Sequence, residues 1–397
     1  MAVVTPLGYT PQMLWAAIRA DQQLADRGII SPEVITRLRK EAAADAGALG
    51  FPFHAQNAEW PGILAASRVD YHLARCALPS MDQLDRSIEL GIMACLQALT
   101  QAGWTAEICS KRDTALLVAT SKGPVLRLLE ACAVQHVGGQ LSESLAWHVA
   151  LGPAALQTAL TKMINPGGPV QTHVAACAGS LVALHRAYQG ISRGEFKRAI
   201  IVSADASIHP LFEHSFQNLG VFARPDESGH RHCRPFDIVG RGFFMSEAAV
   251  AVCLQGGDGG SVEVENCLLM ADATHLLALD PVGTSLERGL RACAAGKEVA
   301  FVHAHAAGTQ HDQVELSAIK RACGAEAAVF SHKRWIGHSL GASGLLGVVI
   351  STMCHQHGEL PMGQKFSRPA RSITIGQGFG GHIGMCVLAG SRGERRP

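Results

Sequence analysis

The sequence has no apolar run of membrane-spanning length and no excess of charge of either sign. Its 34 Lys and Arg residues nearly balance 33 Asp and Glu residues, which leaves a net charge of +1. That balance gives no support to nucleic acid or an anionic membrane as the main partner. Because the N-terminus also lacks the basic-then-apolar pattern of a signal peptide, we expect a cytoplasmic protein.

Paired cysteines are absent as well. The 12 cysteines include no Cys-x-x-Cys pair and follow no regular spacing, so in a chain of 397 residues we expect reduced thiols. Charged residues make up only 17% of the chain and hydrophobic residues 48%, so much of the chain must be buried. The length is sufficient for one large domain or for a duplicated pair.

Apolar strands alternate with helices along the chain, which predicts α/β layers. We expect strands at residues 2–4, 114–119, 170–175, 199–203, 248–254, 262–268, 299–303 and 329–331, near 372 and at 384–388. We expect helices at residues 11–20, 31–44, 85–101, 124–134, 153–163, 285–295, 313–323 and 342–355, with the helix at 85–101 amphipathic. The glycine-rich run 256–260 is the only clear linker, so we divide the chain into halves of residues 1–255 and 256–397. Their similar order of elements suggests internal duplication.

A cysteine lies at the junction between the predicted strand at 170–175 and the helix that follows it. Cys177 is flanked by Ala176, Ala178 and Gly179, and such small neighbours let a substrate approach the sulfur closely. A helix N-terminus at this point is expected to lower the pKa of the thiol and favour the thiolate. A buried structural cysteine is the alternative, and this stretch alone does not separate the two.

Three later stretches contain further chemically active residues. One is 302–309 with His303 and His305, the second is 331–338 with Lys333 and His338, and the third is the Gly-Phe-Gly-Gly run 378–381. Together with Cys177 they form a possible Cys-His-His set with a nearby lysine. A competing interpretation takes four side chains as zinc ligands. They are His303, His305, His311 and Asp312.

In this order the motifs resemble those of the β-ketoacyl synthases, the condensing enzymes of the thiolase-like fold. The resemblance rests on Ala176-Cys177, on His305 to Thr309, on Lys333 to His338 and on Gly378 to Gly381, and it covers nearly the whole chain. It implies an α/β protein of two duplicated thiolase-like halves in a layered αβαβα architecture. The first half would contain the nucleophile and the second half the two catalytic histidines.

The resemblance also implies a role for each residue. Cys177 would be the nucleophile that holds the acyl group as a thioester. His305 and His338 would donate hydrogen bonds that stabilise an enolate, and Lys333 would be a buried cation that holds the histidines in place. All four are catalytic residues in this interpretation. The backbone N–H groups of Cys177 and Phe379 would form an oxyanion hole, with Phe379 also acting as a gate. The expected substrate-binding and supporting residues are Thr309, Phe379, Gly380 and Glu315.

The implied reaction is decarboxylative Claisen condensation of an acyl thioester with malonyl-acyl carrier protein, in fatty acid or type II polyketide biosynthesis. The substrates would be held on phosphopantetheine, so no cofactor and no metal of the protein's own is expected. Ala307 lacks a hydroxyl that the family has at this place, and the loop before Asp312 is one residue shorter than the family pattern, which favours a specialised pathway. Two alternatives stay open: a non-condensing acyltransferase on the same fold, and a non-catalytic partner subunit resembling a chain-length factor.

Partners follow from the same resemblance. An acyl carrier protein would dock through Arg224, together with Arg231 or with a partner subunit, because residues 81–83 do not supply the usual basic site. A homodimer, or a heterodimer with a related subunit, would form through the strand at 170–175. Residues 2–4 supply only the end of the first strand of such a half, so we expect the true translation start to lie upstream of Met1.

Overall fold

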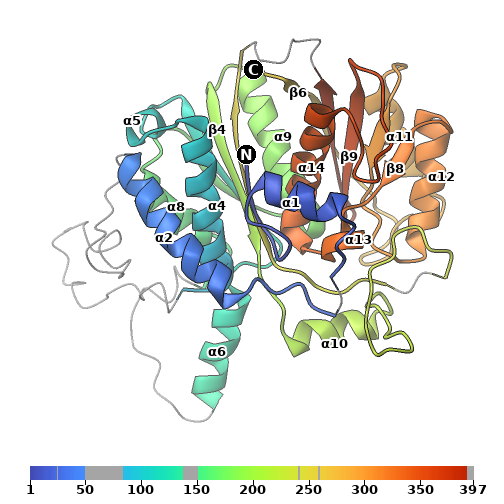
Figure 1. Cartoon of the computed structure of the whole chain (residues 1–397), viewed down its shortest axis with the longest axis horizontal. Coiled ribbons are helices and arrows are strands. Elements are labelled where there is room, and N and C mark those ends of the chain that lie inside the picture. The colour runs from blue at the N-terminus through green and yellow to red at the C-terminus, as the bar shows by residue number, and fades with distance from the viewer. Residues whose placement is uncertain (25, 50–83, 137–150, 240–241, 258–259, 391–397) are drawn as a thin grey trace.

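The computed structural model describes residues 1–24, 26–49, 84–136, 151–239, 242–257 and 260–390 (Figure 1). The described residues contain two five-stranded sheets. The first has the order β1 (Ala2–Val4), β5 (Ala248–Gln255), β4 (Arg198–Asp205), β2 (Thr114–Thr120) and β3 (Val170–Val174). The second has the order β6 (Val262–Ala271), β10 (His382–Gly390), β9 (Arg371–Gly378), β7 (Phe301–His303) and β8 (Ala328–Phe330).

The two sheets have the same topology. In each, the first two neighbour pairs are antiparallel and the last two are parallel. Each sheet is also built from its strands in the order first, fifth, fourth, second and third along its half of the chain. The predicted duplication and the α/β fold class are therefore confirmed. The division at 255/256 falls between the last strand of one sheet and the first strand of the other.

Helices form three layers around the sheets (Figure 1). Two central helices, α9 (Gly179–Ser192) and α14 (Ser343–His357), lie between the sheets and contact both. The outer face of the first sheet is covered by α4 (Arg86–Ala102) and α8 (Ala155–Ile164), and that of the second by α11 (Thr284–Ala294) with α12 (His311–Cys323) against it. The remaining elements are α1 (Pro11–Arg19), α2 (Pro32–Ala48), α5 (Ala106–Cys109), α6 (Val125–His136), α10 (Pro210–Asn218), α13 (Lys333–Ile336), and the short 3₁₀ turns η2 (Ala176–Ala178) and η3 (Leu340–Ala342).

Strand β2 shows how the sequence produces these layers. Leu116 and Val118 belong to the core on the outer side of the first sheet, whereas Leu117 belongs to the core between the sheets. Side chains alternate across a strand, so a strand that is covered on both faces needs a continuous apolar run. Every residue of β2 is buried, as this arrangement requires.

The prediction that the helix at 85–101 is amphipathic is wrong. Helix α4 begins where predicted, with Asp85 as N-cap, but every residue from Ser87 to Leu99 is buried. The reason is that α2 packs on the side of α4 that faces away from the sheet. Glu89 is buried and paired with Arg39 of α2.

Three helices among the described residues were not expected from the sequence: α5, α10 and α13. Helices α5 and α13 span only four residues each, too few to show a helical period. Helix α10 begins at Pro210 directly after a loop. No helix within the described ranges is both long and apolar enough to cross a membrane.

Candidate active site

The nucleophile turn connects β3 to α9 through the single 3₁₀ turn η2. Ala176 has a φ of +45°, a left-handed backbone that directs the next residue out of the strand and into the turn. Cys177 follows it and is 8% exposed. The turn packs against the end of β9, where a Cβ atom on Gly378 would lie only 2.8 Å from the Ala175 carbonyl oxygen. The predicted position of Cys177, between a strand and a helix N-terminus, is confirmed.

The predicted lowering of the Cys177 pKa is wrong. Burial raises the pKa of the thiol to about 11, although Lys122 and Lys333 oppose this shift. Desolvation disfavours the charged form of an acid, and here it outweighs the nearby positive charges. The thiol is therefore protonated at neutral pH. When a thiol exchanges with a thioester, the thiol loses its proton and the departing thiolate takes one up, so the Cys177 proton can pass to the leaving group.

His305 and His338 lie next to each other, with ring centroids 5.4 Å apart and rings nearly perpendicular. Each ring is fixed by a backbone N–H that donates to its Nδ1 atom: Gln377 N–H to His305 at 3.3 Å, and Leu340 N–H to His338 at 3.3 Å. A neutral imidazole with an acceptor Nδ1 must carry its proton on Nε2. Burial lowers the pKa of both histidines, so both are neutral N–H donors.

Lys333 is 1% exposed and its ammonium group donates to the His305 carbonyl oxygen. Burial lowers its pKa, and the charge of Glu315 opposes that shift. Glu315 in turn accepts hydrogen bonds from the N–H of His305 at 2.7 Å and of Ala306 at 2.8 Å. Burial raises the pKa of Glu315 to about 7. Lysine and glutamate thus hold the backbone on both sides of His305, rather than its ring.

Asp312 organises the loop that follows His305. Its carboxylate accepts hydrogen bonds from the N–H groups of Ala307, Gly308 and Thr309, and from the Thr309 hydroxyl at 3.2 Å. It also accepts the N–H of Phe236 from a distant loop. The Thr309 hydroxyl keeps its acceptor lone pairs for a ligand.

Two backbone N–H groups remain near the nucleophile. Outside the helices and strands of the described residues, no backbone carbonyl accepts the N–H of Cys177 or of Phe379. Phe379 lies between Gly378 and Gly380, and its ring stacks with that of Phe216 at 6.5 Å. Gly380 is exposed and its N–H donates to the Leu276 carbonyl oxygen at 3.0 Å. The structure thus brings Phe379 to the site, whereas Gly380 lies outside its wall.

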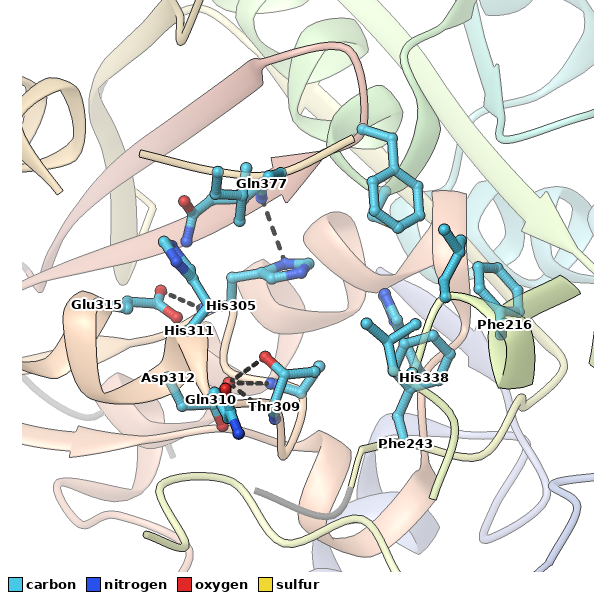
Figure 2. Close-up of a pocket in the computed structure, with 18 of the residues that line it drawn as sticks. Phe216, Phe243, His305, Thr309, Gln310, His311, Asp312, Glu315, His338 and Gln377 are labelled. Atoms are coloured by element: carbon cyan, nitrogen blue, oxygen red, sulfur yellow. Dashed lines mark hydrogen bonds between the residues drawn. The ribbon is translucent and has the colours of Figure 1, made fainter. Parts of the chain in front are cut away.

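These residues surround one cavity of about 990 Å³ (Figure 2). Cys177, His305, His338, Thr309, Glu315 and Phe379 all line it. Lys333 lies behind the wall. Arg224 also lines the cavity, whereas Arg231 lies 3.8 Å from Asp26 in an ion pair. Residues 81–83, the other position considered for docking, lie outside the described residues.

The four candidate zinc ligands are not brought together. His303 turns away from the cavity and forms a buried pair with His332, with 2.8 Å between Nε2 and Nδ1. His305 and His311 line the cavity instead, and Asp312 is occupied by the loop. In the part of the chain that the structure describes, no three His, Cys, Asp or Glu side chains are arranged to hold a metal ion.

Sequence reasoning missed several residues of this site. Gln377 and the aromatic rings of Phe216 and Phe243 line the cavity, and the Phe243 ring packs edge-on against His338 at 4.9 Å. Lys122 is a second cation that acts on Cys177. Only Gln377 had a usable signal, since it is a polar residue at the end of an apolar strand next to the Gly-Phe-Gly-Gly run.

Comparison with known proteins agrees with this geometry. Residues 1–258 match the N-terminal domain of beta-ketoacyl synthases and residues 264–367 match the C-terminal domain. The chain belongs to the β-ketoacyl synthase family. As a member of it, the chain is a condensing enzyme of the acyltransferase class.

Among its relatives in this family, a putative polyketide beta-ketoacyl synthase 1 of Streptomyces halstedii is 26% identical over 79% of this chain and 83% of its own. The 3-oxoacyl-[acyl-carrier-protein] synthase 2 of Mycobacterium leprae is 29% identical over 48% of this chain and 49% of its own. Solved structures share the fold. The ishigamide ketosynthase/chain length factor has a TM-score of 0.73 at 21% identity and covers 98% of this chain and 97% of its own. The ketosynthase ApeO, in complex with its chain length factor ApeC from Xenorhabdus doucetiae, has a TM-score of 0.76 at 15% identity, over 98% and 96% of the chains.

Proposed function

We propose that this β-ketoacyl synthase catalyses decarboxylative Claisen condensation between an acyl group on Cys177 and a malonyl group on acyl carrier protein. The observation that carries the proposal is the meeting of three groups in one cavity: the Cys177 thiol and the Nε2–H donors of His305 and His338. The phosphopantetheine that carries both substrates would enter this cavity, where Thr309 offers an acceptor. The relatives named as polyketide synthases favour a type II polyketide pathway over fatty acid synthesis.

The first half-reaction loads the enzyme. Cys177 attacks the carbonyl carbon of the acyl thioester, and the resulting oxyanion accepts hydrogen bonds from the free N–H groups of Cys177 and Phe379. Collapse forms the acyl-Cys177 thioester and releases the pantetheine sulfur, which takes the proton that Cys177 loses. The reaction therefore consumes no net proton, which suits a thiol whose pKa is raised to about 11.

The second half-reaction breaks the extender unit. Loss of carbon dioxide from the malonyl group leaves an enolate, whose oxygen accepts hydrogen bonds from His305 and His338. Neutral donors suit this role, because an imidazolium beside the malonyl carboxylate would stabilise the state before carbon dioxide leaves. The enolate carbon then attacks the acyl-Cys177 carbonyl, and the β-ketoacyl group leaves on the carrier protein. Cys177 departs as a thiolate, which takes up one proton from solvent because its pKa is raised to about 11.

A direct test uses acyl and malonyl carrier proteins with the purified chain. We expect acylation of Cys177 by mass spectrometry, release of carbon dioxide, and a β-ketoacyl product. Cys177→Ala should abolish both acylation and product. Acylation without release of carbon dioxide would instead identify a non-condensing acyltransferase, and acylation retained by Cys177→Ala would contradict the assignment of the nucleophile.

We further propose that the chain works as a two-fold dimer or with a related subunit, joined through β3. This strand lies at the edge of the first sheet, and Val174 at its end is 51% exposed. Two side-chain atoms of the strand, Gln171 Oε1 and His173 Nε2, lack hydrogen-bond partners within the described residues. The related structures include ketosynthases with a chain length factor and one bound to its acyl carrier protein. Light scattering of the purified chain at micromolar concentration, alone and with a co-expressed related subunit, tests this: a monodisperse monomer in both samples would contradict it.

A further inference from the structure

The cavity has two unlike walls. Figure 2 shows Phe216 and Phe243 on one side of the two histidines and a group of polar residues on the other. The polar group comes from the start of α12, the loop before it and the end of β9. Its members are Thr309, Gln310, His311, Asp312, Glu315 and Gln377. The condensation chemistry described above uses Thr309 and Glu315 from this wall and the backbone N–H of Gln377. It gives no role to the side chains of Gln377 and His311.

Gln377 is the unusual member of the polar wall. Its side chain is 3% exposed, lines the cavity, and has an amide Nε2 with no hydrogen-bond partner among the described residues. A buried amide donor without an acceptor costs free energy, so native proteins leave few of them. Its backbone N–H already holds His305. The unused donor therefore lies in the cavity, on the residue whose backbone N–H fixes the catalytic imidazole of His305.

The surroundings of Gln377 restrict what the ligand atom is. Asp312 and Glu315 line the same wall, so a negatively charged group would meet two acidic side chains. His311 lies beside the Gln377 side chain, and burial lowers its pKa, so it supplies no positive charge to offset them. A neutral oxygen acceptor fits this environment, and in a thioester substrate such oxygens belong to carbonyl groups.

We propose that Gln377 Nε2 and the adjacent His311 form a polar subsite beside His305 that binds a carbonyl oxygen of the thioester substrate. The proposal rests on the proposed function for the presence of a thioester in the cavity. The carbonyl has two possible sources: a keto group of the acyl chain, or an amide of the pantetheine arm. The two sources share the same chemistry and differ in the part of the substrate that must be present.

Binding of unreactive analogues separates this subsite from catalysis. Four ligands have the thioester sulfur replaced by N–H: an octanoyl and a 3-oxooctanoyl chain, each on full-length pantetheine and on an arm cut back to an ethyl group, which lacks both pantetheine amides. Their dissociation constants are measured by calorimetry for the full chain, for Gln377→Met and for Gln97→Met. Methionine keeps the length and the backbone N–H of Gln377 but removes the donor. Gln97→Met makes the same change at a buried glutamine of α4 that does not line the cavity.

We expect Gln377→Met to weaken binding about tenfold for the ligands that contain the recognised carbonyl. A loss confined to the 3-oxo ligands assigns the keto group, and a loss confined to the full-length arms assigns the pantetheine amide. Gln97→Met should leave all four constants unchanged. Equal constants for Gln377→Met and the unaltered chain with every ligand, or no binding of any ligand, would overturn the subsite. Because the assay needs no turnover, absence of acylation or of carbon dioxide release in parallel samples would count against the proposed function alone.

Discussion

The two halves of the molecule contain the same turn, put to different uses. In the first half, β3 leads through η2 into α9; in the second, η3 leads into α14. Each 3₁₀ turn begins with a left-handed residue, Ala176 and Leu340, both with a φ of +45°. The following residue is Cys177 in one turn and Gly341 in the other.

The difference lies in what each turn meets from the opposite half. Gly341 donates its N–H to the carboxylate of Asp205, at the end of β4, over 3.2 Å. Cys177 meets the end of β9, where the corresponding strand position is Gly378 and no side chain is available as an acceptor. One turn is thus closed by a carboxylate, whereas the other keeps its N–H free for the oxyanion of a substrate. Duplication supplied the turn twice, and the residue at the facing strand end decides whether it is structural or catalytic.

Among substitutions that test this difference between the two turns, Gly378→Ala is expected to reduce acylation of Cys177 most. A Cβ atom there would lie 3.1 Å from Cys177 N and 2.8 Å from the Ala175 oxygen, so the nucleophile turn must shift. We expect the rate of Cys177 acylation to fall by about 10² or more, as for loss of an oxyanion-hole donor. Gly47→Ala in α2 is the matched control, because its Cβ would meet nothing within 4 Å. If Gly378→Ala acylated Cys177 as fast as the control does, the small size of residue 378 would not be needed for the nucleophile turn.

The next effect concerns the Cys177 thiol itself. With its pKa raised to about 11, the thiolate fraction increases about tenfold for each pH unit between pH 7 and pH 9. The rate of alkylation by iodoacetamide at Cys177, followed by peptide mass spectrometry, should rise in proportion. If the helix N-terminus controlled the thiol instead, its pKa would be lowered and the rate would level off within this range.

The smallest effect on activity is expected from Asp205→Asn. Asp205 accepts hydrogen bonds from Ser121, Ser207 and Gly341, and an amide can satisfy only part of this set. Each buried donor left unpaired costs about 1–3 kcal/mol, so the melting temperature should fall. Acylation measured well below that temperature should change less than in Gly378→Ala. A larger loss of acylation in Asp205→Asn would mean that both turns take part in catalysis.

Features formed by residues that are close together in the sequence could be predicted, whereas features formed by residues far apart in the sequence could not. The Cys177 turn was predictable because its strand, its small neighbours and its helix are contiguous. The closure of the other turn was not, since Asp205 and Gly341 are 136 positions apart and only the fold brings them together. The direction of the Cys177 pKa shift was predicted wrongly for the same reason: the helix N-terminus is local, but the burial that outweighs it comes from both halves.

The same distinction applies to the helices and the cavity. The expected helices at 31–44 and 85–101 begin at the residues that cap α2 and α4, Ser31 and Asp85. The complete burial of α4 was not predictable, because it depends on α2, which packs against α4 only in the folded chain. Likewise, His305 and His338 were identified by their motifs. Their protonated Nε2 atoms follow from backbone N–H groups that only the structure places.

We infer that the two halves of the molecule divide the reaction: the first half holds the acyl group, and the histidines of the second half promote decarboxylation of the malonyl group. The most direct measurement records both events in one sample: acylation of Cys177 by intact-mass spectrometry and release of labelled carbon dioxide from malonyl carrier protein. For His305→Ala and His338→Ala, each compared with the unaltered chain, we predict a fall in carbon dioxide release of about 10² or more, with acylation still measurable. An equal loss of acylation and decarboxylation in both variants would contradict the account.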